Sequence, residues 1–132
     1  MSGAPGETDL RKMLSSLDVE RRPGSFTFVE VDEATAEQLA VAHAMIVEDE
    51  STTLVLDVAE ARRLGLPVVV DMAWLSLTVQ SSLEAVGLTA AFSVALGEQG
   101  ISCNVLAGFR HDHLLVPSDR ADDAIEALIG LR

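Results

Sequence analysis

Apolar and polar residues alternate along the first half of the chain in a way that predicts short strands and helices. Residues 26–31 (FTFVEV) alternate with a period of two and are rich in strand-forming residues, which predicts a half-buried strand. Residues 34–40 favour a short helix, residues 43–48 and 52–58 are two strands joined across an acidic turn, and residues 59–64 are helical up to Gly65. The predicted order is strand, helix, strand, strand, helix.

The second half repeats this order with a stronger pattern. Its predicted elements are a strand at 74–80, a loop at 81–86, a helix at 87–99 that Gly100 ends, strands at 102–108 and 111–116, and a last helix that Ser118 or Asp119 caps. Asp119, Asp122 and Asp123 lie in the first turn of that last helix, where negative charge is favourable.

Residues 1–22 precede both halves. Leu10, Met13, Leu14 and Leu17 have the spacing of one helical face, which predicts a short helix. We therefore divide the chain into an N-terminal segment with a short helix (1–22), a first module (23–70) and a second module (71–132).

Half-buried strands and one-sided helices indicate an α+β fold, with antiparallel sheets that carry their helices on one face. The second module lacks a final strand, because the sequence ends directly after its last helix. Its open sheet edge needs a cover, which the other half, the N-terminal segment or a second chain would provide. A homodimer with a two-fold axis is the expected assembly.

The composition excludes several partners. Hydrophobic residues make up 48% of the chain and charged residues 23%, which is typical of a globular protein. With 21 acidic and 9 basic residues the net charge is −12, so a polyanion is repelled and we expect neither a nucleic acid nor a membrane as partner. A single cysteine, Cys103, and the lack of a signal peptide or membrane span predict a cytoplasmic protein.

The loop and helix start at 81–88 form the best candidate for a binding site. The N-terminus of a helix offers unpaired N–H groups and a partial positive charge, which favour a carboxylate. Gly87 allows a ligand to approach the backbone closely, and Glu84 is placed to receive an ammonium group. A free amino acid carries both charges. The alternative is an ordinary strand-to-helix loop with a solvated glutamate, because helix N-termini are common.

The segment GLTAAFSVAL at 87–96, followed by Gly100-Ile101-Ser102, resembles the signature of ACT domains. The stretches SSLEAVGLTAAF, GISCNVLAG and HDHLLVP resemble a bacterial branch of that family, whose fold is related to the animal cytosolic arginine sensors. The segments LSSLDVERRPGSFTFVEV and LVLDVAEARRLGLP resemble the N-terminal half of the same branch. The resemblance extends from about Leu10 to Leu131 and is specific in the second half and loose in the first.

This resemblance implies a ferredoxin-like ACT fold, with two βαββα modules, and a regulatory site for a small ligand at an interface between modules. Carried onto this chain, that site is the loop from Ser81 to Leu88. Ser102 stands where many ACT domains have asparagine, and Asn104 follows two residues later. The expected ligand-binding residues are Ser82, Glu84, Val86, Gly87, Leu88 and Asn104. A basic amino acid is the first choice of ligand, since the protein is acidic and the resembled sensors bind arginine.

Catalytic chemistry has little support in the sequence. His111 and His113 would point the same way from a strand and share a metal ion, but two ligands are too few, and a strand or interface role is favoured. Ser81-Ser82 lacks the context of a nucleophile elbow, and Cys103 lies within a predicted strand. We therefore expect no cofactor, no metal and no enzyme activity.

Three hypotheses follow. The first is a non-catalytic regulatory protein that binds a free amino acid. The second is an ACT fold without a ligand that dimerises or docks on a partner protein. The third is a small metal-dependent enzyme that uses His111 and His113.

Overall fold

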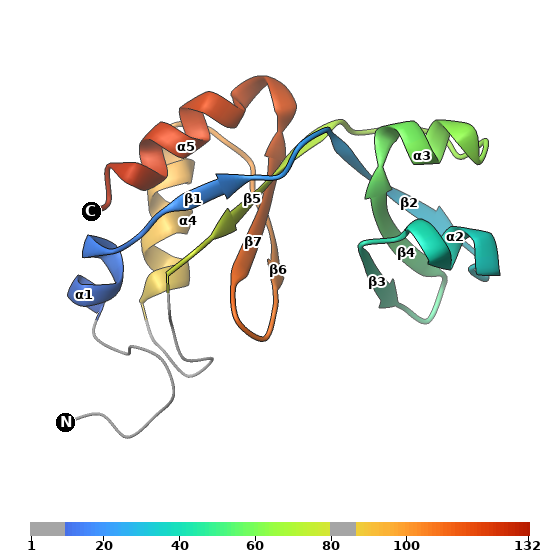
Figure 1. Ribbon diagram of the computed structural model, residues 1–132, viewed down its shortest axis with the longest axis horizontal. Helices are drawn as coiled ribbons and strands as arrows, with labels where there is room; N and C mark the ends of the chain where they lie inside the picture. Colours follow the sequence, from blue (N-terminus) through green and yellow to red (C-terminus); the bar gives the residue numbers. More distant parts are fainter. Residues whose placement is uncertain (1–9, 80–86) are drawn as a thin grey trace. The chain divides into compact units, whose positions relative to one another are not determined.

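The structure is a computed structural model and describes residues 10–79 and 87–132. The chain divides into two compact units. One unit consists of the N-terminal residues up to Arg22 together with Trp74–Arg132, and we call it the split unit. The other, Pro23–Ala73, is inserted within it in the sequence and is called the inserted unit. Figure 1 labels the elements of both units.

The inserted unit contains β2 (Phe26–Val31), α2 (Ala36–Val41), β3 (Ala44–Val47), β4 (Thr52–Asp57) and α3 (Val58–Arg63). Its strands lie in the order β3–β4–β2, all antiparallel, and Met72 at the start of β5 (Met72–Leu77) pairs with Phe26 of β2. The predicted strand at 26–31 is confirmed at both ends. The neighbouring elements are confirmed within two residues.

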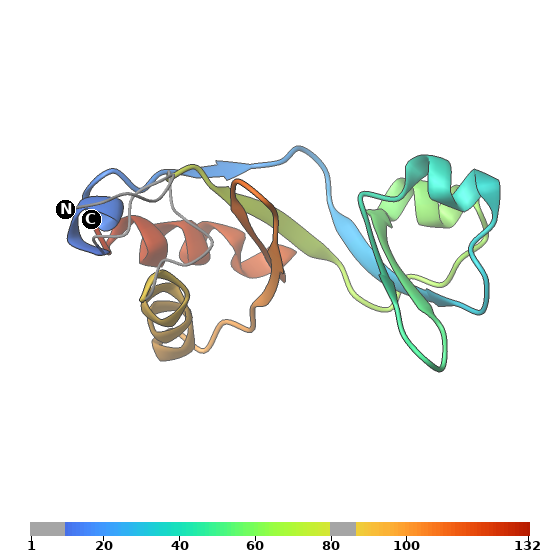
Figure 2. The same cartoon turned by 90° about the horizontal axis from the view of Figure 1, so that it is seen from below.

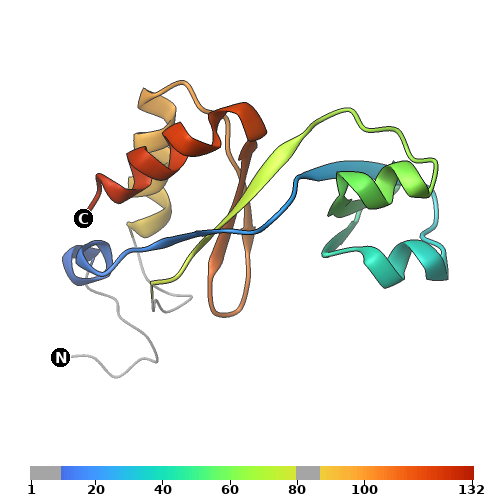
Figure 3. The same cartoon turned by 45° about the horizontal axis from the view of Figure 1, so that its top comes forward.

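One face of this sheet forms the core of the inserted unit. Val29, Leu54 and Leu56 are buried there against Ala61 of α3 and side chains that include Val41 of α2. Figure 3 shows α2 and α3 on the same side of β2. The one-sided arrangement agrees with the alternation along β2, in which every second residue contributes to this face.

The split unit follows the same order with β5, α4 (Leu88–Glu98), β6 (Asn104–Ala107), β7 (Asp112–Pro117) and α5 (Ala121–Ile129). A 3-10 turn, Ser118–Arg120, precedes α5, so the predicted cap by Ser118 or Asp119 is wrong and no side chain caps the helix at Arg120. Asp122 and Asp123 do occupy the first turn of α5.

The N-terminal segment supplies the fourth strand of the split unit. It contains α1 (Leu10–Ser15) and β1 (Val19–Arg21), and β1 pairs antiparallel with β5. The strand order is therefore β1–β5–β7–β6. This strand was not predicted, and of the three possible covers for the open edge the N-terminal segment is the one present along β5.

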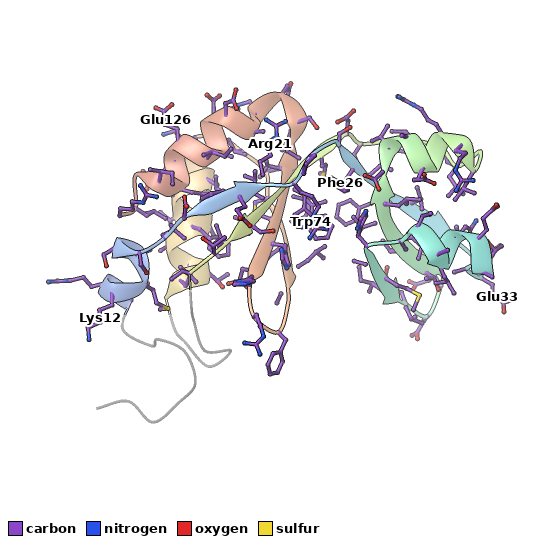
Figure 4. All side chains as sticks on the ribbon, in the orientation of Figure 1. Lys12, Arg21, Phe26, Glu33, Trp74 and Glu126 are labelled. Carbon is purple, nitrogen blue, oxygen red and sulfur yellow. The ribbon has the colours of Figure 1, made fainter. Side chains whose placement is uncertain are left out.

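The helices of the split unit pack on one face of its sheet. Figure 2 shows α4 and α5 on the same side of β1 and β5, and α1 packs against α4. Arg21 reaches from β1 to Asp122 of α5, with 3.6 Å between the guanidinium nitrogen and the carboxylate oxygen, which identifies the helix-covered face (Figure 4). The side chains buried in this unit include Met13, Leu17, Leu75, Leu77, Phe92, Leu96, Leu114, Val116 and Leu128.

Candidate functional site

The N-terminus of α4 is the described part of the predicted ligand site. Gly87 is the N-cap residue and has φ +101°, a backbone conformation that glycine adopts readily and L side chains rarely adopt. Its carbonyl oxygen accepts the N–H of Ala91 at 2.8 Å. Because a glycine cap has no side chain, nothing from Gly87 itself occupies the N–H groups of the first turn.

The side chain of Leu10 in α1 occupies the space beside the α-carbon of Gly87. A Cβ at this position would lie 3.0 Å from Cδ2 of Leu10. The sequence predicted that this glycine admits a ligand to the backbone, whereas in the structure it admits the leucine side chain. An anion at this helix end would therefore contact the backbone N–H groups of the first turn of α4 and not the α-carbon of Gly87.

Charge at this helix end also favours an anion. The first turn of α4 contains no acidic residue, and the helix has 11 residues, long enough for a partial positive charge at its N-terminus. The side chain of Leu88 is 4% exposed and anchors the helix start in the core.

The other predicted ligand residues divide into two groups. Ser82, Glu84 and Val86 lie outside the described residues. Asn104 is the first residue of β6, opposite Leu115 of β7. Leu106 is opposite His113 in the same ladder, so Asn104 projects on the face of the sheet that carries His113, away from α4 and α5.

In the inserted unit, side chains cap the N-terminus of α2, the helix that corresponds to α4. Thr35 caps α2: its hydroxyl oxygen accepts the N–H of Gln38 at 3.1 Å, and the Gln38 side-chain oxygen accepts the N–H of Thr35 at 3.0 Å. This reciprocal capping box satisfies two helix-end donors. Glu37 also lies in the first turn of α2. Within the described residues, the two units therefore differ in how their corresponding helix ends are capped.

His113 forms a polar cluster on the sheet face opposite the helices, with Trp74 and Ser76 of β5. Nδ1 of His113 lies 3.2 Å from Nε1 of Trp74 and 2.8 Å from Oγ of Ser76. The indole N–H of tryptophan can only donate, so Nδ1 of His113 is the acceptor and the ring proton is on Nε2. Sequence reasoning did not predict this cluster, since the pattern shows which face each residue occupies but not that β7 lies beside β5.

Burial and the charge around this cluster favour the neutral form of His113. The guanidinium of Arg22 lies 4.0 Å from the centroid of the Trp74 ring, which is a cation–π contact. Burial lowers the pKa of His113, and the charges of Arg22 and His111 lower this pKa further, against an opposing effect of Asp112. Nδ1 of His111 is buried and has no hydrogen-bond partner among the described residues.

Metal and thiol chemistry receive no support from the described part of the chain. No group of three or more His, Cys, Asp or Glu side chains in residues 10–79 and 87–132 is arranged to hold a metal ion. Burial raises the pKa of the Cys103 thiol, which lowers the fraction of reactive thiolate. Within the same residues, no helix has the length and hydrophobicity needed to cross a membrane.

Comparison with known protein families gives two consecutive matches. Residues 5–72 match a family model described as an ACT domain, and residues 69–129 match a second model with the same description. No curated protein matches the sequence.

Solved structures share the fold over nearly the whole chain. A Vibrio cholerae protein of unknown function, described as a possible transport protein, is 39% identical, with a TM-score of 0.84 and coverage of 94% of this chain and 96% of that one. A protein from Agobacterium tumefaciens has a TM-score of 0.67 at 17% identity, covering 87% and 88% of the two chains.

The regulatory subunit of aspartate kinase from Thermus thermophilus, in its ligand-free form, has a TM-score of 0.61 at 10% identity and covers 98% and 99% of the two chains. At this identity the likeness concerns the fold alone. The strand order of both units, the one-sided helices and the two consecutive matches lead to one conclusion: the chain belongs to the ACT-domain family.

Proposed function

We propose that this chain is a non-catalytic regulatory protein that binds one free amino acid at the N-terminus of α4. The observation that carries the proposal is a contrast within the chain: two ACT modules are present, and the helix end is closed by a capping box in the inserted unit but has a glycine cap in the split unit. A neighbour that matches over nearly the full length of both chains, the Thermus thermophilus protein, is named as a regulatory subunit, which supports a regulatory role.

In the proposed complex the ligand carboxylate accepts hydrogen bonds from the N–H groups of Gly87 and Leu88. A carboxylate placed there is favoured by the helix dipole, by roughly 0.3–1 kcal/mol or more when partly buried. Glu84 receives the ammonium group or a cationic side chain, and Ser82 and Val86 complete the contacts. Asn104, on the sheet face away from α4, is not part of the proposed site. A basic amino acid is the proposed ligand, because the chain has a net charge of −12.

The capping box of α2 predicts the stoichiometry. An anion at that helix end would have to displace the side chains of Thr35 and Gln38 from N–H groups that they already satisfy. Each such hydrogen bond contributes about 0.5–1.5 kcal/mol. We therefore propose one ligand per chain, bound by the split unit.

Isothermal titration calorimetry with the twenty amino acids, accompanied by thermal-shift measurements, tests the proposal. Ligand at about 100 times its Kd should raise the unfolding free energy by about 2.7 kcal/mol. Glu84→Gln should weaken binding by roughly 1.5–3 kcal/mol, the range for hydrogen bonds to charged groups. Glu98→Gln, at the exposed other end of α4, removes the same charge and should leave the affinity unchanged.

Two results would contradict the proposal. The first is the absence of both heat and a melting shift with every amino acid at millimolar concentration. The second is an equal loss of affinity in Glu84→Gln and Glu98→Gln, because this would indicate general electrostatics rather than a contact at the loop.

The second candidate function is an ACT fold without a ligand that dimerises or docks on a partner protein. The observation in its favour is the exposure of apolar side chains on β3. A homodimer and a cytoplasmic location are compatible with both candidates and form part of the proposal.

A further inference from the structure

A hollow in the surface of the split unit lies between α1 and the last residues of the chain, and we call it the α1 hollow. Its volume is about 490 Å³, which is within the range of small-molecule sites. The lining consists of three leucines, two arginines and one serine: Leu10, Leu14, Leu131, Arg11, Arg132 and Ser15. The leucine side chains are half-buried, so they present apolar surface to whatever enters.

Two contacts hold Arg132 in place beside the α1 hollow. Its Nε donates to the carbonyl oxygen of Leu17 at 2.7 Å, and its Nη2 lies 3.3 Å from the carboxylate of Asp18. Leu17 is fully buried, so the first contact joins the guanidinium to the core of the split unit. A guanidinium has more N–H donors than these two contacts use. Arg132 is therefore a preorganised cation at the hollow.

The charge at the α1 hollow is opposite in sign to that of the whole chain. The chain has a net charge of −12 and 9 lysine and arginine residues, and Arg11 and Arg132 both line the hollow. Lys12 follows Arg11 in α1. Among the described residues, no acidic side chain belongs to the lining, and Asp18 contacts Arg132 from outside it. The arginines therefore favour an anion, and the leucines favour an apolar body.

We propose that the α1 hollow binds a small apolar carboxylic acid, as a second ligand site in addition to the one proposed at α4. The carboxylate pairs with the guanidinium groups of Arg11 and Arg132, and the hydrocarbon part lies against the leucines. Arginine and carboxylate form charge-assisted hydrogen bonds, often through two N–H groups of one guanidinium. The ligand differs in class from the amino acid proposed for α4, because it carries no ammonium group.

A small molecule is the occupant that the size and charge of the α1 hollow favour. A second copy of the chain, seated there about a two-fold axis, would bring the guanidinium groups of both chains together, and like charges repel. Residues 1–9, MSGAPGETD, contain one large apolar side chain, Met1, which is little to cover three leucines. A small carboxylic acid supplies both the negative charge and the apolar surface.

Leu10 is the side chain that the α1 hollow and the α4 site have in common. It lines the hollow, and its Cδ2 lies 3.0 Å from the position of a Cβ on Gly87. The three atoms nearest to that position all belong to Leu10. The methyl groups of Leu14 and Leu131 therefore distinguish a ligand in the hollow from a carboxylate at the N-terminus of α4.

Titration with straight-chain carboxylates, followed through the leucine methyl signals by NMR, tests the proposal. Octanoate should shift the signals of Leu14 and Leu131. Binding should strengthen from butanoate to hexanoate to octanoate, by up to about fourfold for each methylene that is buried. Octylamine has the same chain length and the opposite charge. It should bind roughly tenfold more weakly than octanoate, because attraction to the two guanidinium groups becomes repulsion.

Two matched pairs of variants separate the α1 hollow from the surface around it. Arg11→Gln should weaken octanoate binding roughly fivefold, the upper end for an exposed ion pair. Lys12→Gln removes the same charge from a residue outside the lining and should change the affinity by less than about twofold. Ser15→Phe should fill the hollow and abolish binding, whereas Ser16→Phe should not. Both serines are exposed and donate to the carbonyl oxygen of Lys12, so the two variants lose the same hydrogen bond.

Four results would overturn the proposal. The first is octanoate at millimolar concentration that leaves the Leu14 and Leu131 signals in place, or shifts only those of Leu10 and α4. The second is an equal loss of affinity in Arg11→Gln and Lys12→Gln, which would indicate general electrostatics.

The third is a dependence of the Leu14 and Leu131 signals on protein concentration without ligand, which would mean that a second copy covers the α1 hollow. The fourth is nuclear Overhauser effects from these methyl groups to residues 1–9, which would make the chain's own segment the occupant. Failure of amino-acid binding at α4 would change none of these measurements, so the two proposals are tested separately.

Discussion

Replacing Leu17 with alanine tests whether the N-terminal segment is an integral part of the split unit. Leu17 follows α1 and is 0% exposed, and its carbonyl oxygen accepts a hydrogen bond from Nε of Arg132 at 2.7 Å. Truncation of a fully buried leucine costs about 2–5 kcal/mol, from lost transfer free energy and the cavity left behind. Since small domains unfold with about 5–15 kcal/mol, this loss is a large fraction of the stability.

The assay is urea unfolding combined with hydrogen exchange resolved by segment. Leu17→Ala should lower the midpoint, and amides of α4, α5 and β7 should exchange faster because they share a core with Leu17. Amides of β2 and β4 in the inserted unit should keep their protection. Leu39→Ala is the control: Leu39 is 47% exposed on α2, so its truncation should change the unfolding free energy by no more than about 0.5 kcal/mol.

The reasoning would be refuted if Leu17→Ala cost less than about 0.5 kcal/mol, or if faster exchange were confined to residues before Arg22. Either result would mean that α1 and β1 are an appendage whose removal leaves the fold of the second half intact.

Three further predictions concern single residues. Because the pKa of His113 is lowered in the folded state, protonation favours the unfolded chain. The stability that His113 contributes is complete above about pH 6.5 and falls as the pH drops from there through the folded-state pKa. An NMR titration of the ring checks the pKa, and His113→Gln should remove this pH dependence of the stability. Gly87→Ala should destabilise the protein by about 1–3 kcal/mol, because residue 87 has a positive φ and the added Cβ would contact Leu10. Gly97→Ala, inside α4 with no atom near the added Cβ, should stabilise the protein by roughly 0.5–1 kcal/mol. Thermal unfolding measures both changes. The Cys103 thiol should react with a disulfide reagent more slowly in the folded protein than in urea at the same pH, because burial raises its pKa; equal rates would contradict this.

The order of elements was predictable because it depends on local pattern, and the family was predictable from the resemblance of residues 87–102 to the ACT signature. Alternation at 26–31 reports which side chains are buried, and burial in turn reflects a sheet with one covered face, so β2 was placed at both of its ends. Gly100, with φ +67°, ends α4 as predicted, because few residues other than glycine adopt that conformation. The candidate ligand loop was identified by the same kind of local signal, and its function stays a prediction.

The strand β1 could not be predicted from the local pattern of residues, because it depends on pairing with a distant strand. Val19-Glu20-Arg21 is too short and too charged to display an alternation, and it becomes a strand only because β5, more than fifty residues further along the chain, offers it a free edge. The repeated order of elements therefore implied an incomplete second module, and the missing strand is β1 of the N-terminal segment.

The polar cluster at His113 depends on tertiary structure for the same reason. The sequence by itself determined the ACT modules, the faces of their strands and helices, and the glycine at the start of α4, since each is encoded by residues close together in the chain. Only the tertiary structure decided that β7 lies beside β5, which brings His113 to Trp74 and Ser76, and that Leu10 fills the space beside Gly87. Pairings between distant segments are selected by the packing of the whole unit, and no local pattern of residues specifies them.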